Sequence, residues 1–183
     1  MRKVFYGGAI QGNVDRTERQ PIHSALIDTI KGAGCAVVSE HAKGSDFDET
    51  ACLLEASLGR LPPVGQERTV FVRNKMIQFV ESDIAAAIFE TSVPSLGTGI
   101  EIAHAYLRPR LGLPEIPIVV LYETDFWPNN LSSMVKGLAQ GGYPNFQLME
   151  YASEEEACGL VRKFLLSSLT PGSCGSCPLE QES

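Results

Sequence analysis

The sequence has no apolar run near the roughly 18 residues that a membrane-spanning helix needs. Basic residues are also scarce, because 15 Lys and Arg stand against 22 Asp and Glu, a formal net charge of -7. This argues against nonspecific binding to nucleic acid or to an anionic membrane, since both need basic patches. A nucleotide is still compatible, because backbone amides can hold one phosphate. Met1, Arg2 and Lys3 lead into an expected strand instead of a signal peptide, so we expect a cytoplasmic protein.

Cysteine and metal-ligand patterns are sparse too. Five cysteines are an odd number without the framework of a disulfide-rich domain, so reduced thiols are expected. Cys174 and Cys177 form a C-x-x-C, but they lie in a Gly/Ser/Pro-rich stretch without a second ligand pair for zinc. We expect residues 169–183 to be a disordered tail. No other metal-ligand cluster appears, and no cofactor is expected.

Short apolar runs alternate with helical patterns along the rest of the chain. The expected strands cover residues 3–6, 35–39, 84–89, 116–122 and 146–149, and the expected helices cover 21–32, 49–58, 69–80, a stretch from 98, 131–139 and 153–168. This alternation, with no internal repeat, predicts an α/β fold with a doubly wound, five-stranded parallel sheet in a single domain over residues 1–168. The long, irregular connection at 42–68 is expected to be a mobile loop or lid.

The stretch 81–105 contains the candidate chemistry. A buried strand runs into a turn with Ser95 and Gly97, and a helix is expected to begin near Thr98. Glu101 is then expected in the first helical turn, outside the carboxyl end of a core strand, where open α/β sheets bind ligands. The helix amides and the Ser95 hydroxyl form an anion site, and the helix dipole favours an ionised Glu101. This suits an enzyme with a carboxylate nucleophile or base and a phosphorylated substrate, although a capping role for Glu101 is the alternative.

Two further strand ends are candidates. The first strand runs into the glycine-rich residues 7–13, where the backbone can approach a ligand, although the G-x-G-x-x-G dinucleotide motif is absent. His41 follows the second strand almost directly. A lone histidine is more often a surface or hydrogen-bonding residue, so only its position at a strand end makes His41 a candidate.

Five stretches occur together in a typical order. They are FYGGAIQGN at 5–13, SEH at 39–41, SDIAAA at 82–87, PSLGTGIE at 94–101 and LSSMVKG at 131–137. Together they resemble the nucleoside 2-deoxyribosyltransferase superfamily, most closely its 2'-deoxynucleoside 5'-phosphate N-hydrolase and cytidylate N-hydrolase branch. The resemblance covers roughly residues 3–165 apart from 42–68, and its specific part is the S-x-G-x-G-x-E block.

The resemblance implies a flavodoxin-like, Rossmann-like domain that hydrolyses the N-glycosidic bond of a (deoxy)nucleoside 5'-monophosphate. Glu101 would be the nucleophile, forming a glycosyl ester that water resolves. A neighbouring subunit would complete the site, so a homodimer is implied. The implied phosphate-binding residues are Ile10, Gln11, Gly12, Ser95 and Gly97, with Ser132 and Met134 from the neighbouring subunit.

The glycine loop and the expected sugar pocket depart from the family pattern. Ala9 and Gln11 replace the serine and arginine of the usual G-S-I-R-G-G, which removes a cation near the phosphate. In the expected sugar and base pocket, beside Gly8, Phe5 replaces a tyrosine that crowds the 2' position in deoxynucleotide enzymes. Ribonucleotides such as cytidylate are therefore candidate substrates.

The family's proton-donating aspartate is also missing, because its region reads Arg73-Asn74-Lys75. General acid catalysis typically contributes ~10²–10⁴-fold to a rate. Asn74 could position a sugar hydroxyl, and Lys75 could donate a proton only with a lowered pKa. Asp83 is expected at the same pocket in a structural role. His41 is the other candidate, as a proton donor or as a contact to the base.

Two other functions stay open. A base-exchanging deoxyribosyltransferase would use an asparagine from the neighbouring chain, for which Asn129 and Asn130 are candidates. The pair Ser132 and Met134 favours the hydrolase instead, because the resemblance assigns it to a phosphate-accepting enzyme. The missing aspartate motivates the second alternative hypothesis, a nucleotide-binding protein without catalysis.

Overall fold

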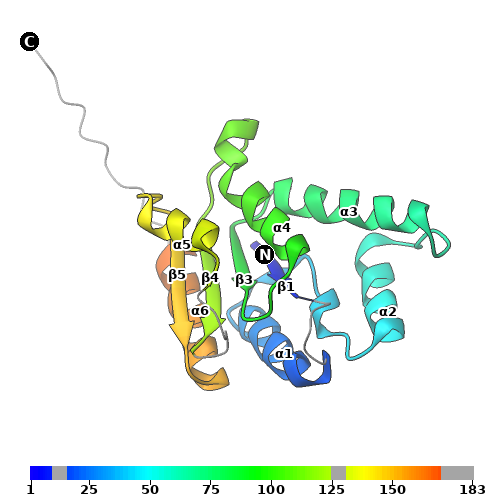
Figure 1. Ribbon diagram of the computed structural model, residues 1–183, viewed down its shortest axis with the longest axis horizontal. Helices are drawn as coiled ribbons and strands as arrows, with labels where there is room; N and C mark the ends of the chain where they lie inside the picture. Colours follow the sequence, from blue (N-terminus) through cyan, green and yellow to red (C-terminus); the bar gives the residue numbers. More distant parts are fainter. Residues whose placement is uncertain (10–15, 125–130, 170–183) are drawn as a thin grey trace, which may run out of the picture.

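The computed structural model describes residues 1–9, 16–124 and 131–169. Within these ranges, five strands form one sheet in the order β2-β1-β3-β4-β5 (Figure 1). All neighbouring strands are parallel. The strands are β1 (Lys3–Gly8), β2 (Ala36–Val37), β3 (Ala86–Glu90), β4 (Ile118–Glu123) and β5 (Phe146–Tyr151). This is the flavodoxin-like order, so the predicted fold class is confirmed.

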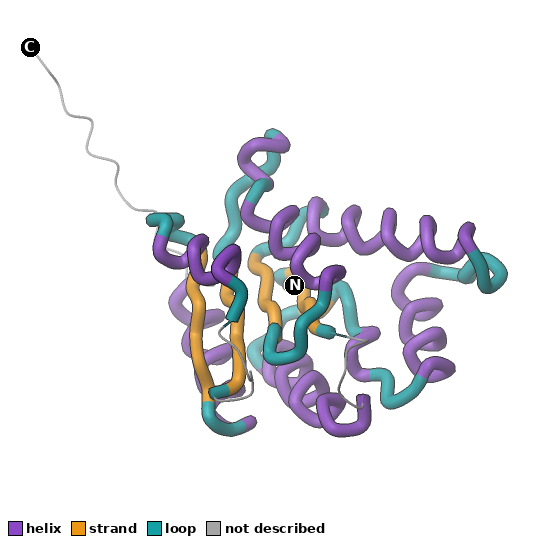
Figure 2. Tube along the Cα trace, viewed as in Figure 1, coloured by secondary structure: helices purple, strands orange, loops and turns teal. Residues whose placement is uncertain are grey.

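Helices cover both faces of the sheet (Figures 1 and 2). The side chains of α1 and α6 pack in one apolar cluster with one face, and those of α3, α4 and α5 pack in a second cluster with the other. The helices are α1 (Arg16–Gly32), α2 (Phe47–Leu58), α3 (Gln66–Glu81), α4 (Leu96–Tyr106), α5 (Ser133–Gln140) and α6 (Glu154–Leu169), with 3₁₀ turns η1 (His41–Lys43) and η2 (Arg108–Leu111). None of these described helices is long and apolar enough to span a membrane.

The central strand β3 and its neighbour β1 are buried on both faces because their residues alternate between the two clusters. Tyr6 and Ile88 point toward α1 and α6, whereas Phe5 and Phe89 point toward α3 and α4. The chain leaves β1 for a helix on one face and leaves β3 for a helix on the other. The carboxyl ends of β1 and β3 therefore form a topological switch point, where α/β folds bind ligands.

The segment 42–68 is largely helical. It contains α2, which the Asp46 side chain caps by accepting a hydrogen bond from the backbone N of Glu49 at 2.8 Å. It also contains the first residues of α3, and Figure 2 shows α2 and this end of α3 standing beside the sheet. The expected lid function of this segment stays a prediction.

Several sequence predictions lie outside the described residues. They concern the glycine-loop residues Ile10, Gln11 and Gly12, the pair Asn129 and Asn130, and the cysteines Cys174 and Cys177.

Candidate active site

A cavity of about 640 Å³ opens at the switch point. The start of α4 forms one wall, with Ser95, Gly97, Thr98 and Glu101. The segment that contains α2 and the first residues of α3 forms another wall, with Thr50, Ala51, Leu54, Leu61 and Arg68. Gly8, the last residue of β1, and His41, which comes shortly after β2, also line the cavity. The fold thus places four other predicted site residues around the same cavity as Glu101: Ser95, Gly97, Gly8 and His41.

Glu101 differs from its sequence prediction in position and in charge. Ser95 is the N-cap, accepting a hydrogen bond from the backbone N of Thr98 at 3.3 Å, and α4 begins at Leu96. Glu101 therefore lies beyond the first turn, where the helix dipole is weak. Burial raises the pKa of Glu101 to about 8. The expected ionised carboxylate is thus mostly protonated at neutral pH, because desolvation outweighs the dipole.

Gly7 makes room for this carboxyl group. A β-carbon at position 7 would lie 2.8 Å from Oε2 of Glu101 and 2.6 Å from Cδ1 of Phe89. Both distances are too short for van der Waals contact, so a larger residue would displace one of the two side chains. Gly7 therefore allows Glu101 to lie against the strand.

His41 lines the cavity as a neutral group. Its side chain is buried, and its Nδ1 has no hydrogen-bond partner among the described residues. Burial and, to a lesser degree, the neighbouring charge of His23 lower the pKa of His41 to about 4. A neutral imidazole can donate or accept a hydrogen bond, but it cannot act as a cationic general acid at neutral pH.

Asn74, Lys75 and Asp83 do not line this cavity. Asn74 is exposed beside Phe71 in a separate depression on α3. Nζ of Lys75 lies 5.7 Å from the centre of the Phe71 ring. Asp83 is exposed and precedes β3, at the end of the strand opposite Glu101.

Phe5 is a core residue. It is fully buried, and its ring centre lies 5.8 Å from that of Phe89. Phe5 does not line the cavity. It supports the site only indirectly, by packing against Phe89, whose ring lies next to Gly7.

Ser132 and Met134 line a different hollow. Oγ of Ser132 caps α5 by accepting a hydrogen bond from the backbone N of Met134 at 3.3 Å. The Met134 side chain is 81% exposed. With Leu96 and Ile100 it borders a mainly apolar groove of about 530 Å³ between α4 and α5, which shares Ser95 with the cavity. Within one chain this pair therefore lies beside the cavity rather than in it.

Arg68 is the site residue that sequence reasoning missed. It is the cation among the described residues that line the cavity. Its Nε donates a hydrogen bond to the carbonyl oxygen of Pro62 at 2.7 Å, and its two Nη atoms have no acceptor in the described chain. Arg68 is the last residue of the segment 42–68 and lies in the first turn of α3. No sequence motif in this segment distinguishes a cavity residue from an exposed one.

In the described ranges, no group of three or more His, Cys, Asp or Glu is arranged so that it could hold a metal ion. The arrangement consists of a half-buried carboxyl group, a helix N-terminus, a neutral imidazole and a guanidinium around one cavity. It can bind an anion and present a carboxylate to an electrophilic carbon.

Comparison with known proteins gives relatives along most of the chain. No family model matches. The chain is similar to a protein of Thermofilum pendens named "Putative 2'-deoxynucleoside 5'-phosphate N-hydrolase 1", with 29% identity over 171 residues, 93% of this chain and 96% of the relative. A Methanosarcina barkeri protein of the same name is 29% identical over 137 residues, 74% of this chain and 69% of the relative. The resemblance that the motifs indicated is thereby confirmed.

Proposed function

We propose that this chain is an N-glycosidase that hydrolyses nucleoside 5'-monophosphates, deoxynucleotides among them, to a free base and a sugar 5-phosphate. The observation that carries the proposal is the position of Glu101, whose carboxyl group lies in a cavity beside the N-terminus of α4. The names of the two relatives point to the same substrate class and reaction.

Glu101 is the nucleophile in this proposal. One carboxylate oxygen attacks C1' of the sugar, the C1'–N bond breaks, and its electron pair leaves with the base. Water then attacks C1', and the ester bond to Glu101 breaks, which returns the carboxylate and yields the sugar 5-phosphate with the original anomeric configuration. The proton that the water releases to solvent balances the one that the departed base takes up from solvent. The attack needs an ionised Glu101, so the raised pKa makes the fraction of active enzyme depend on pH.

The start of α4 binds the substrate phosphate. The Ser95 hydroxyl and the free amides of Leu96 and Gly97 lie together at the positive end of the helix. Arg68 adds a full positive charge to the same cavity and has unoccupied N–H donors. A monophosphate is therefore favoured over an unphosphorylated nucleoside.

His41 faces the departing base. A neutral imidazole can donate one hydrogen bond to a ring nitrogen or carbonyl oxygen of the base while negative charge develops there. The low pKa of His41 makes it a hydrogen-bond donor instead of a cationic acid. The proposal assigns no proton transfer to Asn74 or Lys75, because neither lines the cavity.

Two chains form the active unit in this proposal. The groove between α4 and α5 is apolar, adjoins the cavity through Ser95, and exposes Leu96, Ile100 and Met134. A second copy of α5 packed there would bury these side chains. Ser132 and Met134 of each chain would then lie near the cavity of the other.

Free-base release tests the proposal. Ribonucleoside and deoxyribonucleoside 5'-monophosphates and the matching nucleosides are incubated with the protein, and the free base is separated by chromatography. We expect release from monophosphates only. A labelled second base added to the reaction separates the alternatives, because incorporation of the label would identify a base-exchanging transferase. Tight binding without release from any substrate would identify a binding protein.

A further inference from the structure

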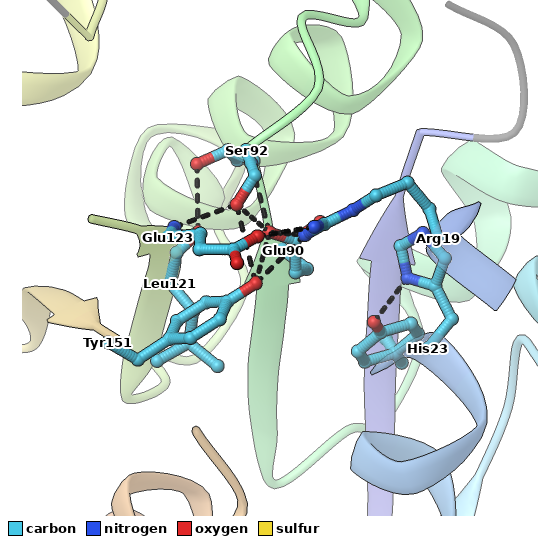
Figure 3. A network of polar contacts seen from close by, with 9 residues as sticks. Arg19, His23, Glu90, Ser92, Leu121, Glu123 and Tyr151 are labelled. Carbon is cyan, nitrogen blue, oxygen red and sulfur yellow. Dashed lines mark hydrogen bonds and ion pairs between the residues drawn. The ribbon is translucent and has the colours of Figure 1, made fainter. Parts of the chain in front are cut away.

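Glu90, the last residue of β3, is a fully buried carboxylate outside the cavity (Figure 3). Its Oε1 accepts hydrogen bonds from Nη2 of Arg19 at 3.1 Å, the Tyr151 hydroxyl at 3.0 Å and the backbone N of Ser92 at 3.0 Å. The Ser92 hydroxyl donates a further hydrogen bond to the same oxygen. One carboxylate oxygen thus collects donors from three different elements.

The partners of Glu90 are also bonded to one another. Arg19 donates to the carboxylate of Glu123, and to the Tyr151 hydroxyl at 2.9 Å. Oγ of Ser92 accepts a hydrogen bond from the backbone N of Glu123 at 2.8 Å. These five residues form one connected network, here called the Glu90 network.

The Glu90 network joins the connections at the carboxyl edge of the sheet. Arg19 lies in the first turn of α1, Glu123 is the last residue of β4, and Ser92 begins the turn that ends at Ser95. Gly8, which lines the cavity, is paired in register with Glu90. The network therefore holds the β3–α4 turn against two neighbouring elements directly beside the cavity.

Stability alone is a weak reason for this arrangement. Burying a carboxylate and a guanidinium is costly, and apolar residues of similar volume often stabilise a core better. Oε2 of Glu90 has no partner within the described ranges, so the charge is only partly compensated there. The network instead fixes the conformation of the short β3–α4 turn, because hydrogen bonds are directional and apolar contacts are not.

We infer that Glu90 is a positioning residue, which acts through Ser92 and Arg19 to hold Ser95 and the first amides of α4 where they bind the substrate phosphate. This inference rests on the proposed function. The inference deepens the proposed function, because it makes phosphate affinity depend on Glu90, a carboxylate on the face of the sheet opposite Glu101.

The test measures KM for a monophosphate, kcat, the inhibition constant of inorganic phosphate and the melting temperature. Ser92→Ala removes the hydroxyl that joins Glu90 to Glu123, and Glu90→Gln removes the charge at nearly constant shape. Each variant is expected to raise KM and the phosphate inhibition constant together, by about 10-fold, the effect of losing one hydrogen bond to a charged group. Because Glu101 is untouched, kcat should change less than about 3-fold.

Tyr151→Phe and Tyr122→Phe form a matched pair. Tyr151 donates to the buried Glu90, whereas Tyr122 donates to Glu150 at the surface, and both substitutions remove one hydroxyl. Only Tyr151→Phe should raise KM and the phosphate inhibition constant. If Glu90→Gln fails to fold, Ser92→Ala and Tyr151→Phe still decide the matter.

Variants that lower the melting temperature but leave KM and phosphate inhibition unchanged would overturn the inference and leave the proposed function intact. A wild type that releases no base from any monophosphate contradicts the proposed function instead. The dissociation constant of inorganic phosphate, measured by calorimetry on the same proteins, then decides the inference. Loss of phosphate affinity in the variants supports the inference. The inference is overturned if the variants bind phosphate as tightly as the wild type, or if the wild type does not bind phosphate at all.

Discussion

Oε2 of Glu101 lies only 2.8 Å from the point that a β-carbon at Gly7 would occupy. The backbone of β1 and the candidate nucleophile are therefore in direct contact, although 94 positions separate them in the sequence (101 − 7). This contact places the carboxyl group at the end of the strand where the cavity opens.

Gly7→Ala is expected to reduce both activity and stability. The added methyl group pushes against Glu101 and Phe89, and overpacking of this kind costs about 1–3 kcal/mol. A displaced nucleophile also lowers activity, on the order of 100-fold in kcat/KM for a shift of about 1 Å. Gly159→Ala is the control, because a β-carbon there meets nothing within 4 Å. Equal kinetics of Gly7→Ala and wild type would contradict the contact.

Stability should fall with rising pH because of Glu101. Its pKa is raised from 4.5 to about 8, so between these values the folded protein holds a proton that the unfolded chain has lost. The free energy of unfolding therefore decreases over this range. Glu101→Gln removes the effect, so the variant should exceed the wild type in melting temperature most at about pH 8 and least at about pH 4. An equal difference at both pH values would show that Glu101 has an ordinary pKa.

Activity should show the opposite trend with pH. Only the ionised form of Glu101 attacks C1', so kcat/KM is expected to rise with pH to a plateau, with an apparent pKa near 8. The pH–rate profile of the free-base assay measures this directly. A rate that is already constant above about pH 6 would mean that the nucleophile is not this half-buried carboxyl group.

Arg68→Met should weaken the binding of phosphorylated substrates. A full charge facing a phosphate across a partly solvated cavity is worth roughly 1–4 kcal/mol, so KM for monophosphates should rise at least about 5-fold. Arg68→Lys should restore part of the affinity, because it restores the charge. Arg60→Met is the control, since Arg60 is exposed and does not line the cavity. A rise in KM of the same size for Arg60→Met would show that overall charge is responsible.

Met134→Asp should separate the proposed dimer. A charge at this exposed side chain prevents burial of the groove between α4 and α5. Light scattering should therefore report a smaller particle, and the free-base assay should show a loss of activity. The control is Leu166→Asp, a similarly exposed apolar residue on α6, which covers the other face of the sheet. A wild type that is monomeric and active would contradict the shared site.

Mixing two inactive variants tests whether the chains share residues. Glu101→Ala and Ser132→Ala are combined and allowed to exchange subunits. Half of the dimers are then mixed, and one of their two sites contains both intact residues, so activity should recover to about a quarter of the wild-type value. No recovery in mixed dimers would show that Ser132 acts within its own chain.

The fold was predictable because its signals are local. Apolar runs of strand length and helical spacing gave the correct type of each element, and even the weakly patterned residues 49–58 form a helix as expected. Errors lie at the ends of elements. The helix after β3 begins at Leu96 instead of Thr98, because Ser95 caps it, and this moves Glu101 out of the first turn.

The site was only partly predictable, since it depends on contacts between distant segments. Ser95 and Glu101 follow from a motif, but whether Asn74 or Arg68 faces the cavity depends on the rotation and tilt of α3. The pKa of Glu101 depends on its burial in the folded chain, where Gly7 leaves room for the carboxyl group. The Glu90 network joins positions from 19 to 151, and no spacing in the sequence indicates it.

The most direct test of the central claim is the rate of free-base release from a nucleoside 5'-monophosphate by wild type, Glu101→Ala and Glu115→Ala at about pH 8. Glu115 is an exposed glutamate that does not line the cavity, so its removal controls for lost charge. We expect Glu115→Ala to match the wild type and Glu101→Ala to lose at least about 1000-fold while still folding. A folded Glu101→Ala protein that releases base at the wild-type rate would contradict the account.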